Sequence, residues 1–234
     1  MPNIVGNPSV NDILSTEDGF VVLGTYDYNL PNSIDPMFGG YLQKFNKQGI
    51  HQWTEVLSGW YFDYMHQVIN TTDGGYAVIA SSESFCSNNV NIASFWLIKT
   101  DALGTIQWQN HFACNKISFG SPVSFASFGS GYIMATTSKG SSWSGAGDTT
   151  LIIIADSVGN EINSFDFVGL TDPRLYNNIL SGYSPDPRVL LLDFNNIGCT
   201  DPIALNYDSI YTLDNGSCVY GKTYVPDDNF ELFV

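Results

Sequence analysis

The sequence predicts an all-β protein, and three observations support that fold class. Of the 234 residues, 14% are aromatic and 22 are glycine, a mixture that favours strands joined by tight turns. The longest apolar runs, such as 151–155 and 189–192, have the length of a strand and fall far short of the roughly 18 residues of a membrane span. A segment of 55 residues also recurs along the chain, and each copy contains short apolar runs bounded by Gly and Asp, which are typical of strands.

A hairpin turn marks each copy of the repeat. It begins with Asn or Asp and ends with Gly, and these pairs recur 55 positions apart: Asn46 and Gly49, Asp101 and Gly104, Asp156 and Gly159. Such a turn suits these residues, because the Asn or Asp side chain bonds the turn backbone and Gly accepts a positive φ. A fourth, shortened copy ends in Phe194-Asn195-x-x-Gly198.

Each full copy predicts four strands. The first strands are expected at 10–15, 65–71 and 123–127, and the second strands at 20–26, 76–82 and 132–138. The hairpin adds two more, as at 96–99 and 105–108. Four antiparallel strands form the blade of a β-propeller. We therefore expect a β-propeller-like domain of about four blades over residues 1–197.

A tryptophan follows the hairpin turn in the first two copies. Trp53 and Trp108 are 55 positions apart, and each should pack between neighbouring blades and bury about 200 Å². The third copy has Asn163 at this place, which predicts a weaker junction. A strand at 3–7 that pairs with 189–194 would close the ring of blades, whereas the alternative is an open arc.

The repeat resembles a known group of proteins. The pattern DGGY…WLIKTDALGTIQW is similar to the repeat of secreted bacterial β-propellers, especially those of Bacteroidota surface proteins. It also overlaps the tryptophan-docking motif of quinoprotein-type propellers at Asp101-x-x-Gly104-x-x-x-Trp108. The resemblance covers about residues 10–198 and implies a fold and a scaffold. The quinoprotein catalytic residues are not recognisable, so that cofactor is not expected.

A second resemblance begins where the repeat ends. Residues 198–220, GCTDPIALNYDSIYTLDNGSCVY, are similar to a GCTDPxAxNYxxxAxxDDGSCxY module of secreted flavobacterial proteins and some marine phage proteins. Tyr211 stands where Ala is usual, and Asn215 replaces the second Asp. We expect a small module over 198–221. Residues 224–231, YVPDDNFE, resemble the opening of a further segment of the same surface proteins, so 222–234 is expected to be a truncated linker or the start of that segment. The chain is expected to be a piece of a longer secreted protein.

Four cysteines, none in a CxxC spacing, leave three pairings open. The resemblance of the module implies a disulfide between Cys199 and Cys218, which would stabilise it by about 3 kcal/mol. Cys86 and Cys114 both belong to the second copy, so we expect them to pair as well. The alternative for these two is a pair of buried free thiols.

Exposed aromatic residues form one candidate binding site. Trp60, Tyr61 and Tyr64 lie in the connection between copies one and two, and Trp143 lies in the loop 139–148. Aromatic planes beside neutral polar groups suit sugar rings, so these residues could bind a glycan. The alternative is that they cap the ends of the blades.

Oxygen-bearing residues of the cysteine module form a second candidate site. Their carboxylate and amide groups are ligands that Ca²⁺ accepts, and the candidates are Asp201, Asn206, Asp208 and Asp214. The spacing is not that of an EF-hand loop. The alternative is that these residues form turns, so calcium is the one possible cofactor and none is required.

The sequence contains little that indicates catalysis. His51, His66 and His111 are scattered and do not form a zinc-binding HxxxH pair. The chain also lacks the GxSxG and GxxxxGK[ST] motifs. The formal net charge is −15, which opposes binding to nucleic acid and to anionic membranes, and no membrane insertion is expected. We therefore do not expect an enzyme.

The expected function is a non-catalytic scaffold or adhesion segment of a larger bacterial surface protein that binds glycans or other proteins. The residues before Lys44 lack the basic and apolar regions of a secretory signal, which alone would indicate a cytoplasmic protein. The cysteines and the resemblances favour an extracellular location instead. Two alternatives stay open, a fragment of a secreted polysaccharide-active enzyme and a fibre or other structural protein of a marine phage.

Overall fold

The computed structural model describes residues 7–28, 37–59, 61–85, 92–118, 123–138, 149–168, 171–176, 179–183, 190–193, 197–211, 213–214 and 218–220. The chain divides into two compact units, Met1–Phe194 and Asn195–Val234. The described residues form strands and turns, which confirms the all-β class. They include no helix that is long and apolar enough to cross a membrane.

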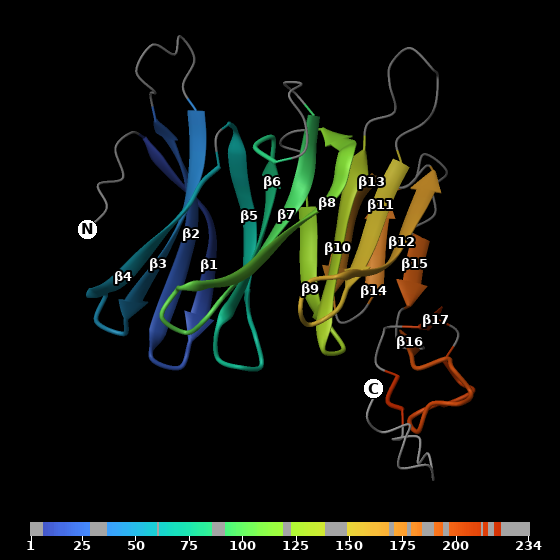
Figure 1. Cartoon of the computed structure of the whole chain (residues 1–234). Helices are drawn as coiled ribbons and strands as arrows, with labels where there is room; N and C mark the ends of the chain where they lie inside the picture. The colour runs from blue at the N-terminus through green and yellow to red at the C-terminus, as the bar shows by residue number, and fades with distance from the viewer. Residues whose placement is uncertain are drawn as a thin grey trace, which may run out of the picture. The chain divides into compact units, whose positions relative to one another are not determined.

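The first unit contains three four-stranded antiparallel sheets and one smaller sheet (Figure 1). The first sheet consists of β1 (Pro8–Thr16), β2 (Gly19–Tyr28), β3 (Met37–Asn46) and β4 (His51–Leu57). The second consists of β5 (Asp63–Asn70), β6 (Tyr76–Ser82), β7 (Ile92–Thr100) and β8 (Ile106–Ser118). The third consists of β9 (Val123–Phe128), β10 (Gly131–Ser138), β11 (Thr149–Ala155) and β12 (Glu161–Val168). The fourth contains β13 (Thr171–Tyr176), β14 (Ile179–Tyr183) and β15 (Leu190–Asp193).

Sheets that follow one another in the chain also pack against one another. The first strand of each later sheet contacts the sheet before it: β5 contacts β1, β2 and β3, β9 contacts β5 and β6, and β13 contacts β9, β10 and β11. We call the three junctions the first, second and third seams. Each sheet is therefore joined to its neighbour mainly through its own first strand.

The sheets do not close into a ring among the described residues. The fourth sheet contains three described strands, not four, and its described neighbours belong to the third sheet. Residues 3–6 of the expected closing strand lie outside the described residues, whereas most of its expected partner at 189–194 is described as β15, which pairs with β14. Asn7, the one described residue of that strand, hydrogen-bonds the Asp27 side chain of its own sheet, with 3.3 Å between Nδ2 and Oδ2.

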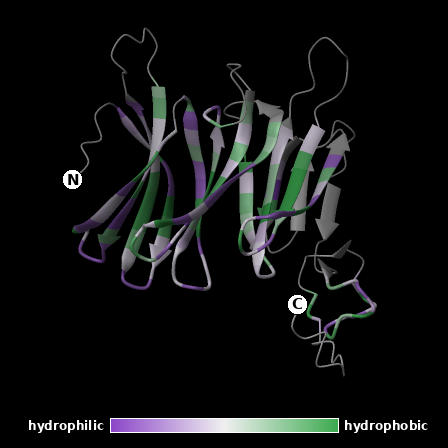
Figure 2. Ribbon diagram, in the orientation of Figure 1, coloured by the Kyte–Doolittle hydropathy of each residue, from purple (hydrophilic) through white to green (hydrophobic). Residues whose placement is uncertain are grey.

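Two apolar clusters fill the first and second seams. One joins residues of the first and second sheets, among them Leu23, Leu42, Met65 and Trp96. The other joins the second and third sheets, where Phe95 and Phe125 are almost fully buried. Figure 2 shows the hydrophobic residues of β11 in green and the hydrophilic β3–β4 turn in purple. The core therefore lies between the sheets, and the polar hairpin turns lie at their ends.

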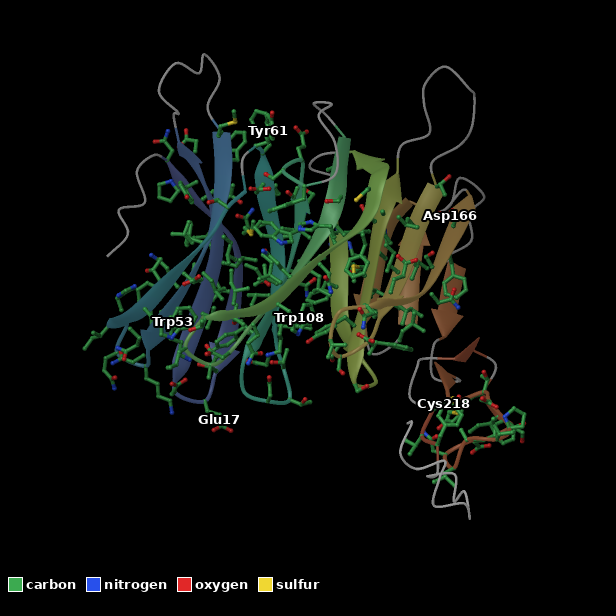
Figure 3. The ribbon with its side chains drawn as sticks, in the orientation of Figure 1. Glu17, Trp53, Tyr61, Trp108, Asp166 and Cys218 are labelled. Atoms are coloured by element: carbon green, nitrogen blue, oxygen red, sulfur yellow. A yellow bond between two sulfur atoms is a disulfide. The ribbon has the colours of Figure 1, made fainter. Side chains whose placement is uncertain are left out.

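The repeat tryptophans pack across these seams, as the sequence predicts. The Trp53 ring on β4 lies 5.9 Å from the Tyr76 ring of the second sheet, at an angle of 52°. It also covers Gly104 of the β7–β8 turn, where an added Cβ would lie 2.6 Å from the indole. The second seam repeats this arrangement one copy later, with Trp108, Tyr132 and Gly159. Figure 3 shows both indoles beside the sheets.

A hydrogen bond from the backbone also crosses each seam. The first strand of one sheet supplies a side-chain oxygen, and the first strand of the next sheet supplies a backbone N–H. The acceptors and donors are Asp12 and Val68 at 2.9 Å, Gln67 and Phe125 at 3.1 Å, and Ser124 and Leu175 at 2.8 Å. These bonds fix the position of each sheet, along the direction of its first strand, relative to the next sheet.

The second unit is small and is held by a disulfide. Its strands β16 (Ile197–Gly198) and β17 (Leu213–Asp214) form a short parallel pair. Cys199 and Cys218 are bonded, as the resemblance of the module implies. Between them, the Leu205 N–H donates to the Val219 carbonyl at 2.7 Å. The disulfide and a few backbone bonds therefore hold a segment that has little apolar core.

Candidate functional site

A groove of about 790 Å³ lies at the first seam, beside the indole of Trp53. Its wall combines two aromatic residues, Trp53 and Tyr76, with the turns that end the strands of both sheets. The polar residues that line it are Ser15, Thr16, Glu17, Asp18, Lys44, Gln52, Asn70 and Thr71. The groove lies where the Trp53 indole crosses the seam between the two sets of turns.

An ion pair sets the charge of the groove. The Lys44 ammonium on β3 lies 2.5 Å from the Asp18 carboxylate of the β1–β2 turn and also donates to the Thr16 hydroxyl. These hydrogen bonds from Lys44 and Thr16 lower the pKa of Asp18 below its usual value, so this carboxylate stays ionised. The lysine side chain is buried and the aspartate is exposed. Asp18 therefore presents a fixed acceptor to the groove.

Apart from the exposed Glu17, the remaining polar groups of the groove are neutral. Gln52 and Asn70 are exposed on opposite sides of the seam, on β4 and at the end of β5. Leu103 is exposed at the lip. An aromatic wall with amide, hydroxyl and carboxylate groups at its edge matches the apolar face and hydroxyl rim of a sugar ring. The groove therefore combines an aromatic wall with hydrogen-bonding groups at its edge.

The predicted aromatic residues lie at the other end of the strands. Tyr61 is exposed in the connection between the first and second sheets (Figure 3). Its backbone N–H donates to the Ser84 hydroxyl at 2.9 Å, and Ser84 in turn donates to the buried Asp63 carboxylate at 2.9 Å. Burial raises the pKa of Asp63. Trp60 and Trp143, also predicted here, lie outside the described residues.

Other rings of the second sheet lie near this connection. The exposed Tyr64 on β5 lies 5.2 Å from the His66 ring. Phe85 stacks on His111 at 4.1 Å, and His111 stacks on Trp96 at 5.9 Å. Phe85 and Trp96 line a recess of about 380 Å³. This recess is half the volume of the seam groove and is lined mainly by apolar residues, so it offers fewer polar partners to a sugar.

The predicted calcium ligands form turns and local bonds. The Asp201 carboxylate accepts from the Ile203 N–H at 3.1 Å and from the Tyr220 hydroxyl at 2.8 Å. Asn206 accepts from the Val219 N–H, and Asp208 accepts from the Ile210 N–H. The backbone of Asp214 belongs to β17, and the structure describes only the backbone of this residue. No cluster of three or more metal-ligating residues occurs among the described residues.

Cys114 also takes part in a disulfide. It lies on β8, one residue after Ala113, whose positive φ of 52° marks an irregular stretch of that strand. Its expected partner, Cys86, lies outside the described residues. The pairing of these two cysteines therefore stays a prediction.

No protein-family model matches the chain, and a search of curated proteins finds no match. The candidate site therefore stands on its own geometry. The sequence does not predict the seam groove, because its residues come from different copies of the repeat. One signal could have indicated it: Trp53, which is expected at a seam, lies next to the polar Gln52.

Proposed function

We propose that this chain is a non-catalytic, extracellular scaffold segment of a larger bacterial surface protein, and that it binds glycans in the groove at the first seam. The observation that carries the proposal is the groove itself. An indole, neutral polar groups and the charged side chains of Glu17, Asp18 and Lys44 line a space of about 790 Å³. A volume of this size is typical of small-molecule sites and is large enough for one or two sugar rings.

The scaffold role is supported by the repeated seams. In the proposed arrangement the four sheets are blades of a propeller-like arc, and each successive pair turns about a shared axis. The tryptophan contacts at the first two seams and the hydrogen bonds at all three are the interactions expected of such an arc. A rigid arc would hold the groove in one shape.

The location outside the cell is supported by the cysteines. Cys199 and Cys218 are bonded, and Cys114 is also oxidised. Disulfides persist in secreted proteins and are rare in the reducing cytosol.

The net charge favours neutral ligands. A chain with a net charge of −15 is repelled by anionic cell surfaces and by anionic ligands.

The ion pair with Lys44 favours a binding role for Asp18, one of the two carboxyl groups that line the groove. Glycoside hydrolysis usually needs one carboxyl group that carries a proton at the working pH. Lys44 instead lowers the pKa of Asp18, so Asp18 can accept hydrogen bonds from sugar hydroxyls but has no proton to donate. The proposal therefore assigns this carboxylate to binding.

A glycan array probed with the whole chain tests the proposal. We expect binding to one class of neutral glycan and a loss of about tenfold in the double variant Gln52→Ala/Asn70→Ala, which removes two hydrogen-bonding groups. Gln48→Ala is the matched control, because Gln48 is an exposed glutamine of the β3–β4 turn outside the groove. It should bind like the unmodified chain.

Other outcomes would contradict the groove assignment. Binding that is lost in Tyr61→Ala but kept in the double variant would place the site at the predicted aromatic connection. An array without any signal would contradict glycan binding. Turnover of a bound polysaccharide would favour the enzyme alternative, and a trimer in solution would favour a phage fibre.

A further inference from the structure

Among the residues that the structure describes, one face of the first sheet lacks the neighbour that covers the same face of the next two sheets. Ile13, Val68 and Phe125 occupy the same register position, because they pair with Val22, Val78 and Met134, which are 56 residues apart. Val68 and Phe125 are buried against the preceding sheet, at 2% and 1% exposure. Ile13 is 62% exposed.

Further residues of this face follow the same rule. Val10 on β1 corresponds to Met65 on β5, because they pair with Gly24 and Ala80. Met65 is fully buried, whereas Val10 is 59% exposed. We define the open face as Val10, Ile13, Phe20, Gly49 and Ile50.

Gly49 corresponds to the glycines that the repeat tryptophans cover, but no described indole covers Gly49 itself. Gly104 and Gly159 have positive φ angles, and each is buried beneath the tryptophan of the sheet before it. Gly49 has the same place in its turn and a φ of +75°, but it is exposed and an added Cβ would meet no atom within 4 Å. Beside it, Phe20 stands where Tyr76 and Tyr132 contact those indoles.

The hydrogen bond that crosses each described seam has no counterpart at this face among the described residues. The backbone N–H groups of Val68 and Phe125 donate to a side chain of the preceding sheet. The equivalent N–H of Ile13 donates instead to the side chain of its own neighbour, Asp12, at 2.9 Å. This local bond satisfies the donor without a preceding sheet.

We propose that the open face is the docking site for a further four-stranded sheet of this repeat, carried ahead of β1 in the same polypeptide. Its fourth strand would supply an indole for Gly49, and its first strand would supply an oxygen for the Ile13 N–H. A sheet at this place would continue the series of described seams, because every one of them joins sheets that are consecutive in the chain.

Two other occupants fit the face less well. A second copy of the chain would need an unused repeat tryptophan, yet Trp53 and Trp108 are both engaged at seams. If the fourth sheet covered this face, Arg174 would lie opposite the Ile13 N–H. Arg174 occupies the register position of Ser124, which is the acceptor at the third seam. A guanidinium group only donates hydrogen bonds, so it cannot accept from Ile13.

The test adds a further sheet ahead of β1. A copy of residues 58–122, which includes the second sheet and the connection that follows it, replaces residues 1–7 directly ahead of Pro8. The unfused reference is the same chain beginning at Pro8. We expect the melting temperature to rise by about 5 °C or more relative to the unfused chain. We also expect amide hydrogen exchange to slow at Ile13 and Phe20.

Matched glycine variants identify the docking contact. Gly49→Ala and Gly74→Ala impose a similar backbone strain, because both glycines have positive φ and open surroundings. In the fused chain, Gly49→Ala should lower the melting temperature more than Gly74→Ala, whereas in the unfused chain the two should be equal. Ile13→Lys should also abolish the gain from fusion.

Three results would overturn the proposal. The fused copy could unfold separately, below the melting temperature of the original chain and without protecting Ile13. Gly49→Ala and Gly74→Ala could have equal effects in the fused chain. The unfused chain could form a dimer in sedimentation that Ile13→Lys dissociates, which would assign the open face to a second copy.

Discussion

Lys44 and Lys99 show how single residues decide what a sheet can bury. Each lysine is 4% exposed, and its ammonium pairs with an aspartate of an adjacent turn, Asp18 or Asp73. A buried ammonium needs such a partner, because an unpaired charge inside a protein is costly. The third copy has Ile154 at the same place, where its turn offers only Gly129 and Ser130. The cation and its partner are therefore absent together.

Two histidines predict how stability changes with pH. Burial lowers the pKa of both His66 and His111 to about 4, while an unfolded histidine titrates near 6.5. The folded state therefore binds protons less readily, and stability is full above pH 6.5 and falls as the pH drops toward 4. Urea unfolding at pH 7.0 and 4.5 should show a loss on the order of 2 kcal/mol for His66. The loss for His111 should be smaller, because solvent partly screens this less buried ring.

The double variant His66→Gln/His111→Gln is the control for this prediction. It should lose most of the pH dependence in that window. Asp73 has a pKa of about 2, so its contribution is lost only below its ordinary value of 3.8. Burial raises the pKa of Asp63, which acts in the opposite direction and favours the folded state on acidification. An unchanged slope in the double variant would contradict the assignment to the histidines.

Most strands could be predicted from the sequence, because alternation and turn residues act locally. The prediction of 76–82 coincides with β6, and 123–127 falls one residue short of β9. The fourth strand of the second copy was harder to predict, since β8 runs to Ser118 and not to Trp108. Its register shifts between Ala93 and Phe95 of the partner strand, and this irregularity breaks the alternation that marks a strand.

The contacts between sheets could be predicted only in part. The tryptophans recur in the sequence, so their place at the seams could be inferred. The acceptors Asp12, Gln67 and Ser124 share no residue type, only an oxygen at one register position. Self-comparison of the sequence cannot detect such a set, because any side chain with an accessible oxygen meets the requirement.

The disulfide of the second unit leads to a prediction for that element. Cys199 and Cys218 are separated by 19 residues, and closing such a loop stabilises the folded state by about 3 kcal/mol. In the variant Cys199→Ser/Cys218→Ser, limited proteolysis should cut between these positions. The melting of the first unit should stay unchanged. Equal resistance to the protease with and without the disulfide would contradict this role.

The candidate site emerges only at the scale of the whole first unit. The sequence predicts binding residues in the connection that contains Trp60, Tyr61 and Tyr64, and in the loop that contains Trp143. Such aromatic residues can be recognised locally in a sequence. The seam groove instead joins turns from two copies around Trp53 and Lys44. Its existence depends on how the sheets pack, which no local pattern specifies.

A double-mutant cycle between Trp53 and Gly104 tests the central claim, that an indole docked on the next sheet's turn holds each of the first two seams. Gly49→Ala measures the backbone strain alone, about 1 kcal/mol, because nothing lies above that glycine. We predict that Gly104→Ala costs at least 1 kcal/mol more than Gly49→Ala in the unmodified chain, and that this excess disappears in the Trp53→Ala background. If the effects of Trp53→Ala and Gly104→Ala instead add within about 0.3 kcal/mol, the indole does not dock at that turn and the account of the seams is wrong.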